Sequence, residues 1–91
     1  MITATVNGLW KGAPIRQMID FDPDRRLENQ HKKVIATVVG NLDPHDLAPQ
    51  PLGVESAADF ALRVGFTKFD YLYEQNGGQV VVDVLDPSKA I

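Results

Sequence analysis

Two histidines and the aspartates beside one of them are the residues best suited to chemistry in this chain. His31 and His45 stand at either end of an apolar run, and Asp43 and Asp46 lie within two residues of His45. Imidazole and carboxylate groups bind zinc and act as general acids or bases. If residues 32–40 form a strand, however, the two histidines lie roughly 30 Å apart near its ends. We therefore predict a turn after that strand, with no metal, no catalytic residue and no cofactor.

A pair of aspartates near the end of the chain is the second candidate. An Asn-Gly pair at 76–77 predicts a two-residue hairpin turn, which sets Tyr73 opposite Val80 and makes one face wholly apolar. The same register sets Asp70 opposite Asp83 on the outer face. Neighbouring carboxylates can split their pKa values, hold a cation or contact a partner. On an exposed face, screening by water and a nearby lysine is the favoured interpretation.

The single tryptophan is a candidate anchor for a partner. Trp10 stands between Gly8 and Gly12, in a segment that we expect at the edge of the sheet. Tryptophan is enriched at the centres of protein interfaces, but it also covers the ends of small cores. We include it, with Asp70 and Asp83, among the predicted partner-binding residues.

A mixed basic stripe is predicted over residues 16–33. Phosphate binding needs such a stripe, but acidic residues are interleaved with the basic ones and nearly cancel their charge. A solvated surface of mixed charge is therefore favoured. If the stripe does bind nucleic acid, the residues that do so are Arg16, Arg25, Arg26, Lys32 and Lys33.

The elements that position these residues are predicted to form one α+β domain over residues 1–91. We expect a mainly antiparallel sheet of four or five strands, with one helix at about 55–65 packed on one face. Ser56 is the predicted N-cap of that helix, and Gly65 suits its C-terminal end. A C-terminal β-hairpin is predicted at 67–85.

The first half of the chain predicts strands. Residues 2–6 form a strand that ends either in an Asn7-Gly8 turn or in a loop, and a second strand covers 15–21. The β-branched run at 34–40 indicates a central strand buried on both faces. Between them, residues 22–33 form a short exposed helix or a polar hairpin tip. The remaining segments are a Pro-rich loop at 43–54 and a frayed tail at 86–91.

Composition limits the classes of function. The chain has 91 residues, a net charge of −3 and no cysteine, so disulfides and thiolate chemistry are excluded. We expect a soluble, cytoplasmic protein. One helix is too small to cover such a sheet, so a second copy of the chain or an obligate partner protein is predicted to cover the rest.

The favoured function is a non-catalytic interaction factor of the accessory, inhibitor or immunity type that covers a surface of a partner protein. The alternatives are a nucleic-acid-binding module and a small enzyme with its site at a dimer interface.

Overall fold

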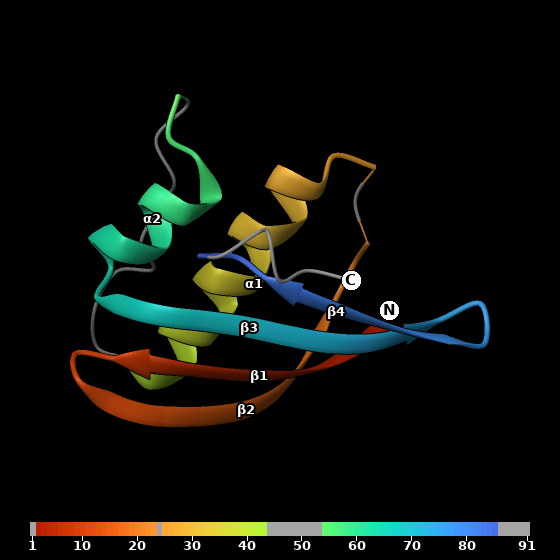
Figure 1. The fold of residues 1–91 in the computed structure, drawn as a ribbon, viewed down its shortest axis with the longest axis horizontal. Coiled ribbons are helices and arrows are strands. Elements are labelled where there is room, and N and C mark those ends of the chain that lie inside the picture. Colours follow the sequence, from red (N-terminus) through yellow and green to blue (C-terminus); the bar gives the residue numbers. More distant parts are fainter. Residues whose placement is uncertain (1, 24, 44–53, 86–91) are drawn as a thin grey trace.

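An antiparallel sheet with two helices on one side makes up the fold (Figure 1). The computed structural model describes residues 2–23, 25–43 and 54–85. Neighbouring strands lie in the order β2-β1-β3-β4. The predicted α+β class, the antiparallel sheet and the C-terminal hairpin are confirmed. The elements are β1 (Ile2–Trp10), β2 (Ala13–Phe21), α1 (Leu27–Leu42), α2 (Ala57–Arg63), β3 (Phe66–Gln75) and β4 (Gly78–Asp83).

The first hairpin turns later than the sequence predicts. Strand β1 runs straight through Asn7 and Gly8, and the turn lies at Lys11 and Gly12, whose φ angles are 51° and 84°. The predicted turn or loop at residues 7–8 is therefore wrong. Glycine at position 8 instead allows β1 to lie close to β3, because a Cβ there would lie 2.6 Å from the Lys68 carbonyl oxygen on β3. The strand predicted at 15–21 lies within β2 and is confirmed.

Residues 34–40 are helical, so the predicted central strand is wrong. They form the second half of α1, and the preceding polar residues form its first half rather than a hairpin tip. Tertiary packing overrides the weak strand preference of the β-branched residues. The buried side chains recur at helical spacing and face the sheet; they are Gln30, Val34, Ile35, Val38 and Val39.

Because residues 34–40 are helical, the predicted strand buried on both faces no longer supports a homodimer. The apolar run at 34–40 needs no second cover, because it belongs to a helix that packs on the sheet. Helix α1 and helix α2 together cover one face.

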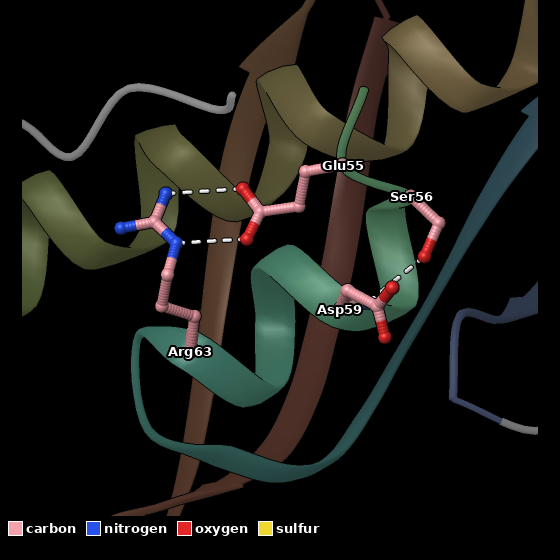
Figure 2. Close-up of polar contacts among 4 residues, drawn as sticks. All are labelled: Glu55, Ser56, Asp59 and Arg63. Carbon is pink, nitrogen blue, oxygen red and sulfur yellow. Dashed lines mark hydrogen bonds and ion pairs between the residues drawn. The ribbon is translucent and has the colours of Figure 1, made fainter. Parts of the chain in front are cut away.

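Helix α2 begins where the capping pattern predicts. The Ser56 hydroxyl accepts a hydrogen bond from the Asp59 backbone N–H at 3.1 Å (Figure 2). Arg63 donates hydrogen bonds to both carboxylate oxygens of Glu55, at 2.8 and 3.1 Å (Figure 2). Gly65 has a φ of 110°, as expected of a glycine that ends a helix.

The predicted register of the last hairpin is confirmed. Asn76 and Gly77 have φ angles of 54° and 77°, Tyr73 pairs with Val80, and the two strands continue to the end of β4. The apolar face of this hairpin lies under the helices. Tyr71 and Tyr73 stack there at 5.9 Å between ring centroids.

Candidate functional site

An apolar row crosses all four strands on the face of the sheet turned away from the helices. Met18 on β2 pairs with Thr5 on β1, which pairs with Leu72 on β3. Leu72 pairs in turn with Val81 on β4. Among the described residues, no helix or strand lies over this side (Figure 1). We name this side the open face, and we name Met18, Thr5, Leu72 and Val81 the apolar row.

Exposure within the apolar row is uneven. The Met18 side chain is 73% exposed, whereas Leu72 and Val81 are half-buried between their strand neighbours. Single exposed apolar residues are common on protein surfaces, so it is the continuity of the row across the sheet that makes it notable. The sequence analysis missed this row, although the correctly predicted hairpin register already sets Leu72 opposite Val81.

A charged row runs beside the apolar row. Arg16 pairs with Asn7, Asn7 pairs with Asp70, and Asp70 pairs with Asp83. The predicted juxtaposition of the two aspartates is therefore present, and both side chains are half-buried. Asp83 also accepts a hydrogen bond from the Leu85 backbone N–H at 3.2 Å. This charged row is cationic at the β2 edge and anionic at the β4 edge.

The open face is hollowed beside the apolar row. A shallow depression of about 460 Å³ lies over β1, because the side chains of Thr3 and Thr5 are short and the flanking Met18 and Leu72 side chains are long. Glu74 also lines this depression. Thr3 donates a hydrogen bond to Asp20 at 2.6 Å, so the rim of the open face is polar. An apolar centre with a polar rim is the usual anatomy of a protein interface.

Trp10 lies at the end of β1 and packs against the core. Its indole N–H donates to the Val64 carbonyl at 2.9 Å, and the Lys11 ammonium lies 4.6 Å from the ring centroid. A Cβ on Gly65 would approach the indole nitrogen to 3.3 Å, so the glycine makes room for the tryptophan. These contacts explain the tryptophan as a cover over the turn between α2 and β3. Its role in partner binding stays a prediction.

The predicted basic stripe is divided between the two sides of the sheet. Arg16 belongs to the open face, while Arg25 and Arg26 precede α1, and Lys32 and Lys33 lie on α1 itself. The stripe was expected to continue from one strand to another, and it does not, because residues 32–33 are helical.

His31 lies on α1 and contacts a tyrosine of the sheet. Its Nδ1 lies 2.6 Å from the Tyr71 hydroxyl, and the amide nitrogen of Gln30 donates to the hydroxyls of Tyr71 and Tyr73, each at 3.3 Å. This cluster was not predicted from the sequence, because His31 was expected to precede a strand rather than to lie within a helix. A helical period through residues 27–42 would have set Gln30 and His31 on the buried side.

Burial shifts the proton affinities within this cluster. It raises the pKa of Tyr71 to about 12, although the hydrogen bond from Gln30 acts in the opposite direction. Burial also lowers the pKa of His31 below its usual 6.5, and the Glu28 carboxylate opposes that effect. At neutral pH the tyrosine is protonated and the imidazole is neutral, so the phenol and Nδ1 share a hydrogen bond between neutral groups. Tyr71 is 1% exposed, which makes this contact structural and closed to substrates.

The other residues of the first candidate site do not join His31. Asp43 follows α1, and its backbone N–H donates to the Val39 carbonyl at 2.9 Å. His45 and Asp46 lie outside the described residues. Within residues 2–23, 25–43 and 54–85, no group of three or more histidines or acidic residues is arranged to hold a metal.

Comparisons with known proteins yield no relative. No family model, no curated protein and no solved structure matches the chain. In the part of the chain that the structure describes, no helix is long and apolar enough to cross a membrane. The open face is therefore the candidate functional site on its geometry alone.

Proposed function

We propose that this protein is a small non-catalytic interaction factor, of the accessory, inhibitor or immunity type, which covers a surface of a partner protein with its open face. The observation that carries the proposal is the apolar row, whose most exposed member, Met18, projects from the edge strand β2. Burying that row removes apolar area from water on both partners. The cysteine-free composition favours action in the cytoplasm.

Charge adds selectivity to this surface. Among the described residues of the open face, the carboxylates of Asp20, Asp70, Glu74 and Asp83 lie around the apolar row, and Arg16 and Lys68 are the cations. A partner with an apolar patch bordered by basic residues fits this pattern. Complementary charge of this kind steers association and rejects wrong partners.

Crosslinked capture from the native lysate tests the proposal. Met18→Asp places a charge in the apolar row, and Leu62→Asp is the matched control because Leu62 is 55% exposed on α2, away from the open face. We expect one protein to be recovered in near-stoichiometric amount with the wild type and with Leu62→Asp, and to be lost with Met18→Asp. Equal recovery with all three would refute binding through the open face. Circular dichroism confirms that each variant is folded.

Nucleic-acid binding is the alternative that the same capture separates. Arg25, Arg26, Lys32 and Lys33 lie on the helical side, so charge reversal at Arg25 and Arg26 removes nucleic acid while leaving the open face unchanged. Recovery of nucleic acid that is released as salt rises, and that is lost in the charge-reversed variant, would replace the protein-binding proposal.

A further inference from the structure

We infer that a second copy of the chain covers the open face of the isolated protein, around a two-fold axis that runs parallel to the strands between β1 and β3. This inference concerns the same surface as the proposed function and goes beyond it, because it assigns that surface a second occupant in the isolated protein. It does not depend on the incorrect strand at 34–40. It depends on whether the apolar and charged rows of the open face are complementary to the same rows of a second chain.

The two-fold axis superposes each row on the same row of the second copy. Rotation about a line parallel to the strands reverses the strand order, so β2 lies over β4 of the second copy and β1 lies over β3. Met18 then faces Val81 of the second copy, and Thr5 faces its Leu72. The apolar row is therefore buried against an apolar row, as self-complementary two-fold interfaces require.

The depression over β1 receives a side chain in this arrangement. Its floor is formed by Thr3 and Thr5, and Leu72 of the second copy lies directly over Thr5. A leucine fills the space that the short threonine leaves, and the contact occurs twice by symmetry. Such interdigitation is how two sheets pack about 10 Å apart.

The charged row is also complementary to itself. Arg16 faces Asp83 of the second copy, with Asp70 one strand further, and the two-fold axis repeats the contact. An axis perpendicular to the strands would instead place Asp70 over Glu74 and Arg16 over Asp20 of the second copy, so each opposite-charge contact is offset by a like-charge contact. The charge pattern thus selects one of the two face-to-face arrangements.

The size of the face indicates a weak, concentration-dependent dimer. Four strands about 4.8 Å apart and about eight residues long cover roughly 500 Å² on each copy. Interfaces of this size stand at the low end of specific complexes. A partner with a better fit can therefore displace the second copy, which reconciles this dimer with the proposed function.

Sedimentation of charge-reversed variants tests the ion pairs. We expect Arg16→Asp and Asp83→Arg each to weaken self-association about tenfold or more, because each sets like charges together twice. Mixing the two variants restores both ion pairs in a heterodimer, so association returns to the wild-type value. A mixture that stays monomeric would overturn the arrangement. Circular dichroism confirms that both variants are folded, and Lys33→Asp, on α1, is the control that leaves association unchanged.

Cysteine crosslinking tests the direction of the axis. The chain contains no cysteine, so Met18→Cys and Val81→Cys each carry a single thiol. Facing positions lie about 10 Å apart across the interface, whereas two copies of position 18 lie about 18 Å apart in the inferred dimer. A short bis-maleimide is expected to crosslink the two variants only when they are mixed. Crosslinking of Met18→Cys alone would overturn the inference.

The dimer and the proposed function fail in different ways. A wild-type chain that sediments as a monomer up to near-millimolar concentration overturns the dimer, whereas loss of the captured partner with Met18→Asp still supports the proposed function. A dimer that behaves as inferred, with partner capture unchanged in Met18→Asp, supports the second copy and refutes partner binding through this face.

Discussion

Substitution of Tyr71 by phenylalanine tests the polar cluster between α1 and the sheet. Tyr71→Phe removes one oxygen and leaves the stacked ring in place. Two contacts of that oxygen are lost, the 2.6 Å contact with His31 and the 3.3 Å hydrogen bond from Gln30. Gln30 is 2% exposed, so water does not replace the lost partner.

The expected cost follows from these two contacts. A hydrogen bond contributes about 1 kcal/mol net, and a buried donor left with one partner fewer adds to that value. We expect Tyr71→Phe to lower the free energy of unfolding by about 2–3 kcal/mol. Tyr73→Phe is the matched control, because its hydroxyl accepts one hydrogen bond from the same Gln30 amide. Its expected cost is about 1 kcal/mol.

Urea denaturation at pH 7.5, followed by circular dichroism, measures both variants. At this pH the imidazole is neutral, because burial lowers the pKa of His31. A domain of this size changes its Tm by about 4–8 °C for each kcal/mol, so thermal melts check the same ranking. Equal losses in Tyr71→Phe and Tyr73→Phe would show that the His31 contact adds nothing, and the reasoning about the cluster would be wrong.

Three further predictions concern stability. Gly8→Ala is expected to lower the free energy of unfolding by about 1–3 kcal/mol, because the added Cβ meets the β3 backbone. Gly40→Ala is expected to raise it by about 0.5–1 kcal/mol, because the added Cβ meets open space and alanine favours the helix. The same denaturation assay measures both variants. Ser56→Ala removes the α2 cap and costs about 1 kcal/mol, measured by thermal melts. His31 has a lowered pKa in the folded state, so the unfolded chain binds more protons below pH 6.5, and stability falls as pH drops below that value. The slope reaches at most about 1.4 kcal/mol per pH unit, and His31→Asn flattens it in urea titrations at several pH values. A slope that persists in His31→Asn would contradict the role of this histidine.

The second half of the fold could be predicted because its signals are local. A two-residue turn at Asn76 and Gly77 fixes which residues pair, and a register slip would break the apolar face of the hairpin. The N-cap at Ser56 depends on an adjacent backbone N–H. Neither signal needs information from a distant part of the chain.

Helix α1 was missed because its sequence was divided at the wrong place. Taken separately, residues 22–33 have almost no apolar side chain, and residues 34–40 have almost no polar one. Joined, they place Gln30, Val34 and Val38 on one face at a spacing of four residues. The stripe begins with a buried glutamine, whose amide nitrogen donates to the hydroxyls of Tyr71 and Tyr73, far along the chain.

The same Asn-Gly pair occurs twice in the chain, but it forms a turn only at the second position, whereas Asn7 and Gly8 lie within a strand. At Asn76-Gly77 the backbone needs positive φ angles, whereas Gly8 is required by the β3 backbone that lies against it. The second requirement comes from a strand some sixty residues later, so no local pattern reveals it. The open face has the same origin: Met18 and Leu72 lie far apart in the sequence, and they become neighbours of Thr5 only when β1 is placed between β2 and β3. A site made of single residues from separate strands is therefore visible only once the strand order is known.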